Sequence, residues 1–133
     1  MNIIFGAENA EMVMKDNKYI VLELDTVRPE AHRDPVVAYA IVNTISLGEM
    51  GQMPAYIDWH KDLINDYKTK KWDECLQTIQ MLYGHFNGEL DSFYDIIGRR
   101  IQYYKENDPG KEWQGVWEAW DEEANQLIFF PKA

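Results

Sequence analysis

Three histidines, one cysteine and many carboxylates are the residues of this 133-residue chain whose types could do chemistry. The stretch DWHKD sets His60 between two aspartates, a grouping that raises the question of a metal site. Side chains two positions apart on a helix lie about 200° around its axis, so these three do not converge. His85 has no histidine or cysteine at helical spacing, and His32 lies alone in a proline-flanked loop. We therefore expect no metal site, and three partly exposed histidines without a catalytic role.

Cys75 falls on the apolar face of a predicted helix. A thiol acts as a nucleophile when it is accessible and close to a base or a positive charge, so we expect Cys75 to be a buried small side chain instead. Carboxylates gather at Glu89, Asp91 and Asp95, where negative charge favours the N-terminus of a helix. The sequence has no nucleotide-binding, hydrolase or zinc-protease motif. It therefore predicts no catalytic residue and no cofactor, with an enzyme that uses carboxylates and histidines as the alternative.

The formal net charge of −10 argues against a protein that binds nucleic acid through its phosphates. The basic clusters are small, with Lys68, Lys70 and Lys71 in one and Arg99 and Arg100 in the other. Solubility is the simplest reason for such an excess of acid, and a basic partner is another. A second alternative function is therefore acidic mimicry of nucleic acid.

Length and composition indicate one domain that spans residues 1–133. Apolar residues make up 46 % of the chain, which is enough to fill a core. No apolar run approaches the ~18–20 residues that a membrane span requires, and the N-terminus lacks the pattern of a signal peptide. With a single cysteine, these features predict a cytoplasmic protein that does not contact membranes.

The first 46 residues have the pattern of a small sheet. Apolar runs at 2–5, 19–27 and 36–46 predict strands, and the last two are expected to pair as a central hairpin. Residues 7–15 contain good helix formers at helical spacing, but part of this segment also fits a strand. Both interpretations stay open from the sequence.

The predicted strand at 19–27 shows the clearest alternation of the chain. Leu22 and Leu24 point to one face of the strand, and we expect Glu23 and Asp25 on the other. This pattern predicts one buried face and one partly solvated face.

Beyond residue 52 the apolar period becomes that of helices. Helices are predicted at 54–69, 72–86 and 90–106, and their short connections predict antiparallel packing. The expected fold is therefore α+β, with a mixed part at 1–46, a helical part at 52–120 and a tail at 121–133. Within the tail, QLIFF (126–130) is expected to return as an edge strand or to pack without pairing.

Aromatic and small residues recur at a characteristic spacing in the helical region. Tyr67 precedes Trp72 by five positions, and Asp73 and Cys75 open the next helix. Further on come Arg99 or Arg100, the turn NDPG, and the run Trp113-Gln114-Gly115-Val116. Over residues 64–117 this pattern resembles the tetratricopeptide-like helical tail that follows the catalytic domain in many bacterial adenylate cyclases.

The resemblance implies a helical interaction scaffold and no cyclase activity, because the chain has no cyclase catalytic domain. Gln114 also stands where that tail carries an acidic residue. The structural roles that the resemblance implies fall on Tyr67, Trp72, Cys75, Trp113, Gly115 and Val116. Trp113 and Val116 are therefore expected to be substantially buried against the second and third helices.

Three segments, YIVLELDTV, KKWDECLQTIQML and GELDSFYDIIGRRI, together resemble small proteins of marine phages and ocean metagenomes. That resemblance implies a phage origin and a location in the cytoplasm of an infected host cell. It supplies no catalytic residue.

These observations predict a non-enzymatic interaction or regulatory protein that binds a protein partner or a second copy of itself. Exposed aromatic and arginine side chains are the usual anchors of such contacts. The expected interaction surface comprises Trp59, Arg99, Arg100, Tyr103, Tyr104, Trp117 and Trp120. Trp117 and Trp120 lie beyond the matched run Trp113-Gln114-Gly115-Val116, so no structural role is expected of them.

Overall fold

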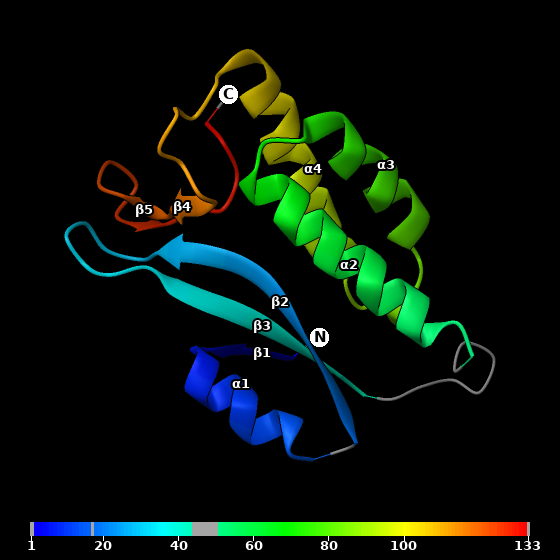
Figure 1. Ribbon diagram of the computed structural model, residues 1–133. Coiled ribbons are helices and arrows are strands. Elements are labelled where there is room, and N and C mark those ends of the chain that lie inside the picture. The colour runs from blue at the N-terminus through cyan, green and yellow to red at the C-terminus, as the bar shows by residue number, and fades with distance from the viewer. Residues whose placement is uncertain (1, 17, 44–50, 133) are drawn as a thin grey trace.

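The computed structural model describes residues 2–16, 18–43 and 51–132, and within them the predicted α+β class is confirmed. A four-stranded sheet lies between α1 on one side and α2, α3 and α4 on the other (Figure 1). The elements are β1 (Asn2–Phe5), α1 (Ala7–Met14), β2 (Tyr19–Arg28), β3 (Val36–Asn43), α2 (Met53–Lys68), α3 (Trp72–Leu82), the 3₁₀ turn η1 (Phe86–Gly88), α4 (Asp91–Glu106), β4 (Val116–Glu118), β5 (Trp120–Asp121) and β6 (Gln126–Leu127).

The sheet has the order β1-β3-β2-β4, so the predicted hairpin of β2 and β3 forms its centre. β1 and β2 both pair antiparallel with β3, whereas β4 pairs parallel with β2. The N-terminal segment that fitted either a helix or a strand is the helix α1. The predicted strand end at residues 44–46 lies outside the described residues.

A bulge in β2 changes which way Asp25 points. Glu23 pairs with Tyr39 and Asp25 pairs with Ala38, the next residue of β3. Leu24 is therefore an extra residue in β2, inserted between two consecutive pairs. A bulge reverses the alternation of the side chains that follow it. The expectation that Asp25 faces away from Leu24 is therefore wrong, and its carboxylate reaches a buried arginine on α4.

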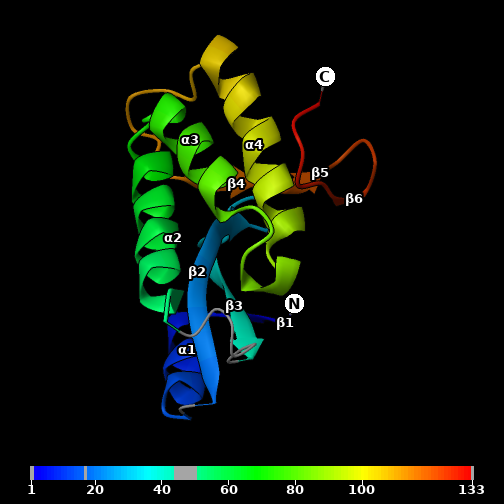
Figure 2. The same ribbon diagram turned by 90° about the vertical axis from the view of Figure 1, so that its right-hand side faces the viewer.

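The three long helices form one layer over the sheet. The chain reverses direction between α2 and α3 and again between α3 and α4 (Figure 2). Pro54 lies in the first turn of α2, where a missing N–H is tolerated. α3 ends at Leu82, earlier than predicted, because Tyr83 is extended and Gly84 has φ +88°.

The predicted helical part at 52–120 is wrong beyond Glu106. After the NDPG turn the chain is extended, and Gly115 has φ +102°, a conformation that favours glycine over other residues. Val116 then begins β4, whose backbone pairs with β2. The first two residues of QLIFF form β6, which pairs with β5 in a separate two-stranded sheet.

An aromatic cluster joins the ends of the three helices to the segment after α4. The ring of Trp113 lies 5.1 Å from the rings of both Tyr67 and Tyr104, and 5.7 Å from that of Trp72. Its indole nitrogen donates a hydrogen bond to the carbonyl oxygen of Val116 at 3.0 Å. Trp113 and Val116, which we expected to be substantially buried, are half-buried. Trp113 contacts the second and third of the long helices, as expected, and it also contacts the first.

Within the part of the chain that the structure describes, no helix is long and apolar enough to span a membrane.

Gly115→Ala should destabilise the protein by about 1–3 kcal/mol, because alanine is strained at positive φ. An added Cβ would also lie 2.9 Å from Cγ of Lys68. Gly98→Ala is the matched control, since Gly98 lies within α4 with open space around it, and it should stabilise by about 0.5–1 kcal/mol. Urea unfolding measures the free energy of unfolding of both variants. Equal changes in the two would contradict a requirement for glycine at position 115.

Candidate binding groove

A groove of about 470 Å³ lies where the end of α4 meets β4, β5 and the C-terminal segment, and we call it the aromatic groove. It brings together several residues of the predicted interaction surface. Tyr103, Tyr104, Trp117 and Trp120 line it, together with Pro109, Trp113, Val116, Glu118, Ala119, Asp121, Glu122, Ile128, Phe130, Pro131 and Lys132. The aromatic groove is therefore the candidate site to which the sequence analysis points.

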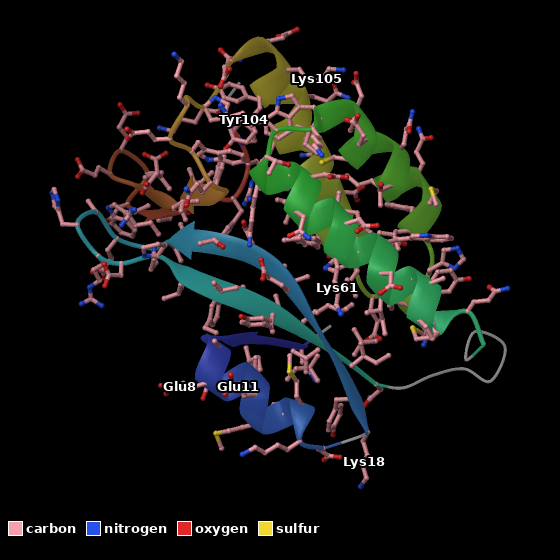
Figure 3. The ribbon with its side chains drawn as sticks, in the orientation of Figure 1. Glu8, Glu11, Lys18, Lys61, Tyr104 and Lys105 are labelled. Atoms are coloured by element: carbon pink, nitrogen blue, oxygen red, sulfur yellow. The ribbon has the colours of Figure 1, made fainter. Side chains whose placement is uncertain are left out.

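Tyr103, Trp120 and Phe130 are exposed aromatic side chains that line the groove. Tyr103 is 40 % exposed on the last turn of α4, and Trp120 is 38 % exposed at the start of β5. The pairing of β5 with β6, Trp120 opposite Leu127, positions the tryptophan backbone. Figure 3 shows Tyr104, the neighbour of Tyr103, at the end of the molecule opposite Glu8 and Glu11 of α1.

Tyr104 and Arg100 are buried, so their expected place on an exposed surface is wrong. Tyr104 is 7 % exposed because its ring stacks on Trp72 at 5.4 Å. Arg100 is fully buried, one helical turn earlier on α4. The face of α4 that carries these two residues is covered by the C-terminal segment and the aromatic cluster.

Arg100 makes polar contacts with segments far apart in the sequence. Its Nη1 donates to both carboxylate oxygens of Asp25, at 3.0 and 2.9 Å, and its Nε donates to the carbonyl oxygen of Phe129 at 3.0 Å. The guanidinium lies 4.2 Å from the ring of Trp117. Burial raises the pKa of Asp25, and the positive charge of Arg100 opposes that effect.

Trp117 has a structural role, contrary to expectation. Its ring stacks on the Arg100 guanidinium, and its indole nitrogen donates to the carbonyl oxygen of Ile128 at 2.7 Å. One face of the groove is therefore fixed by hydrogen bonding to the C-terminal segment.

The other predicted interaction residues lie at different places. The guanidinium of Arg99 lies 4.7 Å from the ring of Phe130, which lines the groove. Trp59 lies on α2, where its ring is 5.6 Å from that of Tyr56, and it is not part of the groove. Sequence spacing could not distinguish these positions, because the groove is assembled by long-range strand pairing.

Carboxylates of the β4–β5 region give the groove a negative rim. Glu118, Asp121 and Glu122 line it, and Lys132 lies 2.7 Å from Asp121 as an ion pair. This contact lowers the pKa of Asp121 and raises that of Lys132. The rim thus already holds an ammonium group of the same chain, and Glu118 pairs with Arg28 at 3.0 Å.

His60 is buried and hydrogen-bonded, so the expectation of a partly exposed histidine is wrong for this residue. Its Nε2 lies 2.6 Å from the carbonyl oxygen of Glu23, and its Nδ1 lies 2.9 Å from the hydroxyl of Tyr94. A carbonyl only accepts, so the proton is on Nε2, and Nδ1 accepts from the tyrosine. Burial lowers the pKa of His60, which the interaction with Glu23 partly offsets.

Among the described residues, no three His, Cys, Asp or Glu side chains are grouped so that they could hold a metal ion. Cys75 is fully buried, and burial raises the pKa of its thiol to about 12. A thiol with that pKa is protonated at neutral pH, so it packs as a small apolar group.

No protein-family model matches the chain, and searches of curated proteins and of solved structures find no match. The resemblances to cyclase tails and to phage proteins therefore stay predictions.

The buried ion pair should show strong energetic coupling. Asp25→Leu and Arg100→Met should each destabilise the protein by about 3–5 kcal/mol, because each leaves one buried charge without its partner. The double variant should lose less than the sum of the two single variants, since it buries no unpaired charge. Urea unfolding of the four proteins measures this coupling.

The matched control is the surface pair Lys105 and Asp73, whose charged atoms lie 2.9 Å apart between α4 and α3. Both side chains are well exposed, so the same cycle should show little coupling there. Additive losses at Asp25 and Arg100 would contradict a stabilising contact between them.

His60 should make stability depend on pH below its ordinary pKa of 6.5. The unfolded state takes up a proton there more readily than folded His60, so the free energy of unfolding falls as the pH drops. Between pH 7 and 5.5 the wild type should lose up to about 1 kcal/mol relative to His60→Gln. Thermal unfolding across this range measures the difference, and parallel curves for the two proteins would disprove it.

Proposed function

We propose that this protein is a non-enzymatic interaction protein that binds a basic segment of a partner protein in the aromatic groove. One observation carries the proposal: exposed Trp120 and Tyr103 line the same groove as Glu118, Asp121 and Glu122. Aromatic faces attract cations, and carboxylates at their edge add a direct ion pair. This combination suits arginine and lysine side chains.

The groove's own contacts support a cationic occupant. Lys132 reaches Asp121 inside the groove, and it also lies 3.7 Å from Glu123. Arg99 stacks on Phe130 beside it. A partner's lysine or arginine would meet the same kinds of group, and the net charge of −10 would draw a basic segment toward the protein.

The same charge argues against a second copy as the occupant of the groove, because two acidic surfaces repel each other. A homodimer through this surface is thus an outcome to be tested by the molecular mass in solution. Part of the proposal is that α2, α3 and α4 serve as a tetratricopeptide-like scaffold, with Tyr67, Trp72 and Cys75 in structural roles. A regulatory role in a phage-infected cell is the context that the sequence resemblance implies.

A fluorescein-labelled peptide of four Arg-Pro repeats provides the test, and the matching Glu-Pro peptide is its counterpart. The arginine peptide should bind and the glutamate peptide should not, as measured by fluorescence anisotropy. Raising the salt concentration from about 50 to about 500 mM should weaken binding, because salt screens the attraction between exposed charges. Trp120→Ala should weaken it about tenfold, a typical effect of removing an aromatic anchor.

Trp59→Ala, the same substitution on α2, is the control and should leave the affinity unchanged. Circular dichroism checks that both variants are folded. Equal binding of the two peptides would refute the proposal, and so would a larger effect of Trp59→Ala than of Trp120→Ala.

A further inference from the structure

A second hollow, of about 440 Å³, lies on the other side of the C-terminal segment, and we call it the apolar cavity. It is bounded by β1, β2 and β3, by the first half of α4, and by the segment after β6. Leu127 and Phe129 line this cavity, whereas Ile128 and Phe130 line the aromatic groove. This alternation is that of an extended chain, which presents successive side chains on opposite sides. The C-terminal segment therefore separates the two hollows.

Exposed apolar side chains gather at the apolar cavity. Ile3 and Phe5 of β1 line it and are 46 % and 56 % exposed. Val36, Leu127 and Phe129 line it as well, and each is exposed. Concentrated apolar exposure of this kind is uncommon on a soluble monomer and is typical of a surface that contacts another molecule.

β1 also forms one edge of the four-stranded sheet. It pairs with β3 on one side, and among the described residues no strand pairs with its other side. In Figure 2 the N-terminal end of β1 lies at the outer margin of the sheet, whereas α1 lies toward the opposite margin. Proteins usually protect such an edge with charged residues, proline or a bulge. The strand NIIF has no charged residue and no proline, and its pairing with β3 is regular, so this edge is unprotected.

The pairing with β3 determines which backbone groups this edge presents. The amide of Gly6 donates to the carbonyl oxygen of Val37 at 2.9 Å, so Gly6 faces β3. Successive residues of an antiparallel strand face alternately toward and away from their partner strand, so the N–H and C=O groups of Ile3 and Phe5 point away from β3. In agreement, the carbonyl oxygen of Phe5 accepts a hydrogen bond from the side chain of Asn9 at 2.9 Å. The edge therefore directs the backbone groups of two residues outward.

We propose that a second copy of this chain pairs its own β1 antiparallel with this edge, so that the two four-stranded sheets continue as one. A two-fold axis at Ile4 places Ile3 of each copy opposite Phe5 of the other. The outward N–H and C=O groups of these residues then meet as hydrogen-bonded pairs, since a carbonyl oxygen such as that of Phe5 can accept two hydrogen bonds. Cross-strand pairs of an aromatic and a β-branched side chain also stabilise a sheet. Because a two-fold contact is closed, the assembly is a dimer.

The distribution of charge favours this edge for a second copy. Each copy carries a formal net charge of −10, so two copies repel each other wherever acidic residues meet. β1 has no charged residue, and the two charged residues that line the apolar cavity, Asp25 and Arg100, pair with each other. Glu8 and Glu11 belong to α1, on the other face of the sheet (Figure 3). The contact is thus placed where repulsion between the copies is least.

The area that a dimer needs also favours a second copy over a single peptide strand. Stable interfaces bury about 800 Å² on each partner, more than the pairing of two four-residue strands provides. A two-fold axis perpendicular to the sheet keeps the helices of both copies on one side, so the two apolar cavities lie next to each other there. Their exposed apolar side chains add to the contact between the strands. This interface goes beyond the peptide binding proposed for the groove and does not depend on it.

Analytical ultracentrifugation of the wild-type protein from about 1 to about 300 µM tests the proposal, since small interfaces dissociate at such concentrations. A reversible equilibrium between monomer and dimer is expected, without larger species. Raising the salt concentration from about 50 to about 500 mM should strengthen the dimer, because salt screens the repulsion between two acidic copies. The same change should weaken the binding of the arginine peptide to the groove, so the two contacts respond to salt in opposite directions.

Ile3→Lys should raise the dissociation constant of the dimer at least about tenfold, because lysine on an edge strand opposes pairing with another strand. Met81→Lys on α3 is the matched control, since Met81 is 45 % exposed and lies outside the apolar cavity, and it should leave the dimer intact. Ile3→Pro removes the outward N–H without adding a charge, and it should weaken the dimer to a similar extent. Circular dichroism checks that the three variants are folded.

The proposal is overturned if the wild type stays monomeric over this range, if larger species form, or if salt weakens the dimer. It is also overturned if folded Ile3→Lys and Ile3→Pro dimerise as tightly as the wild type, or if Met81→Lys weakens the dimer as much as Ile3→Lys does. Loss of the dimer in Trp120→Ala would place the contact in the groove and overturn it as well. Binding of the arginine peptide is measured separately on Ile3→Lys, so either proposal can fail while the other stands.

Discussion

The burial of Arg100 is the constraint on which the rest of this structure depends. Removing a guanidinium from water is costly unless its charge is balanced and most of its donors meet acceptors. Asp25 of β2 supplies the charge, the carbonyl of Phe129 accepts from Nε, and Trp117 of β4 covers the flat face. One side chain of α4 thereby joins the sheet, the edge strand and the C-terminal segment.

The bulge in β2 makes that contact available. In a regular strand Asp25 would lie on the face opposite Leu24, on the far side of the sheet from α4. The extra residue turns Asp25 toward the helices, and Ala38 opposite it leaves room. Alternation predicted the strand correctly, because burial of one face determines the pattern, and adjacency in the sequence predicted its pairing with β3. It could not predict the bulge, since nothing local in YIVLELDTV distinguishes a strand with one extra residue from a regular one.

The same limit explains what could be predicted of the candidate site. Helical periodicity located α2, α3 and α4 closely, and composition singled out Tyr103 and Trp120 as aromatic residues that the structure leaves exposed. Periodicity could not show that the chain after Glu106 returns to pair with β2. That pairing depends on the conformation of Gly115 and on a partner strand about ninety positions earlier in the chain. Arg100 and Trp117 were therefore assigned to a surface, whereas each buries the other. The apolar cavity had no sequence signature, since its wall comes from five separate segments.

The segment after β6 is a single stretch of chain, yet its alternate side chains line two different hollows. Its backbone is tied to the domain by the carbonyls of Ile128 and Phe129, which accept from Trp117 and Arg100. A molecule that displaced this segment from one side would also displace the side chains that line the other side. Thermodynamic linkage makes that effect reciprocal, so each occupant would alter the affinity for the other by the same factor. The two sides of this segment are thus joined by the same few backbone hydrogen bonds, without a hinge or a subunit rotation.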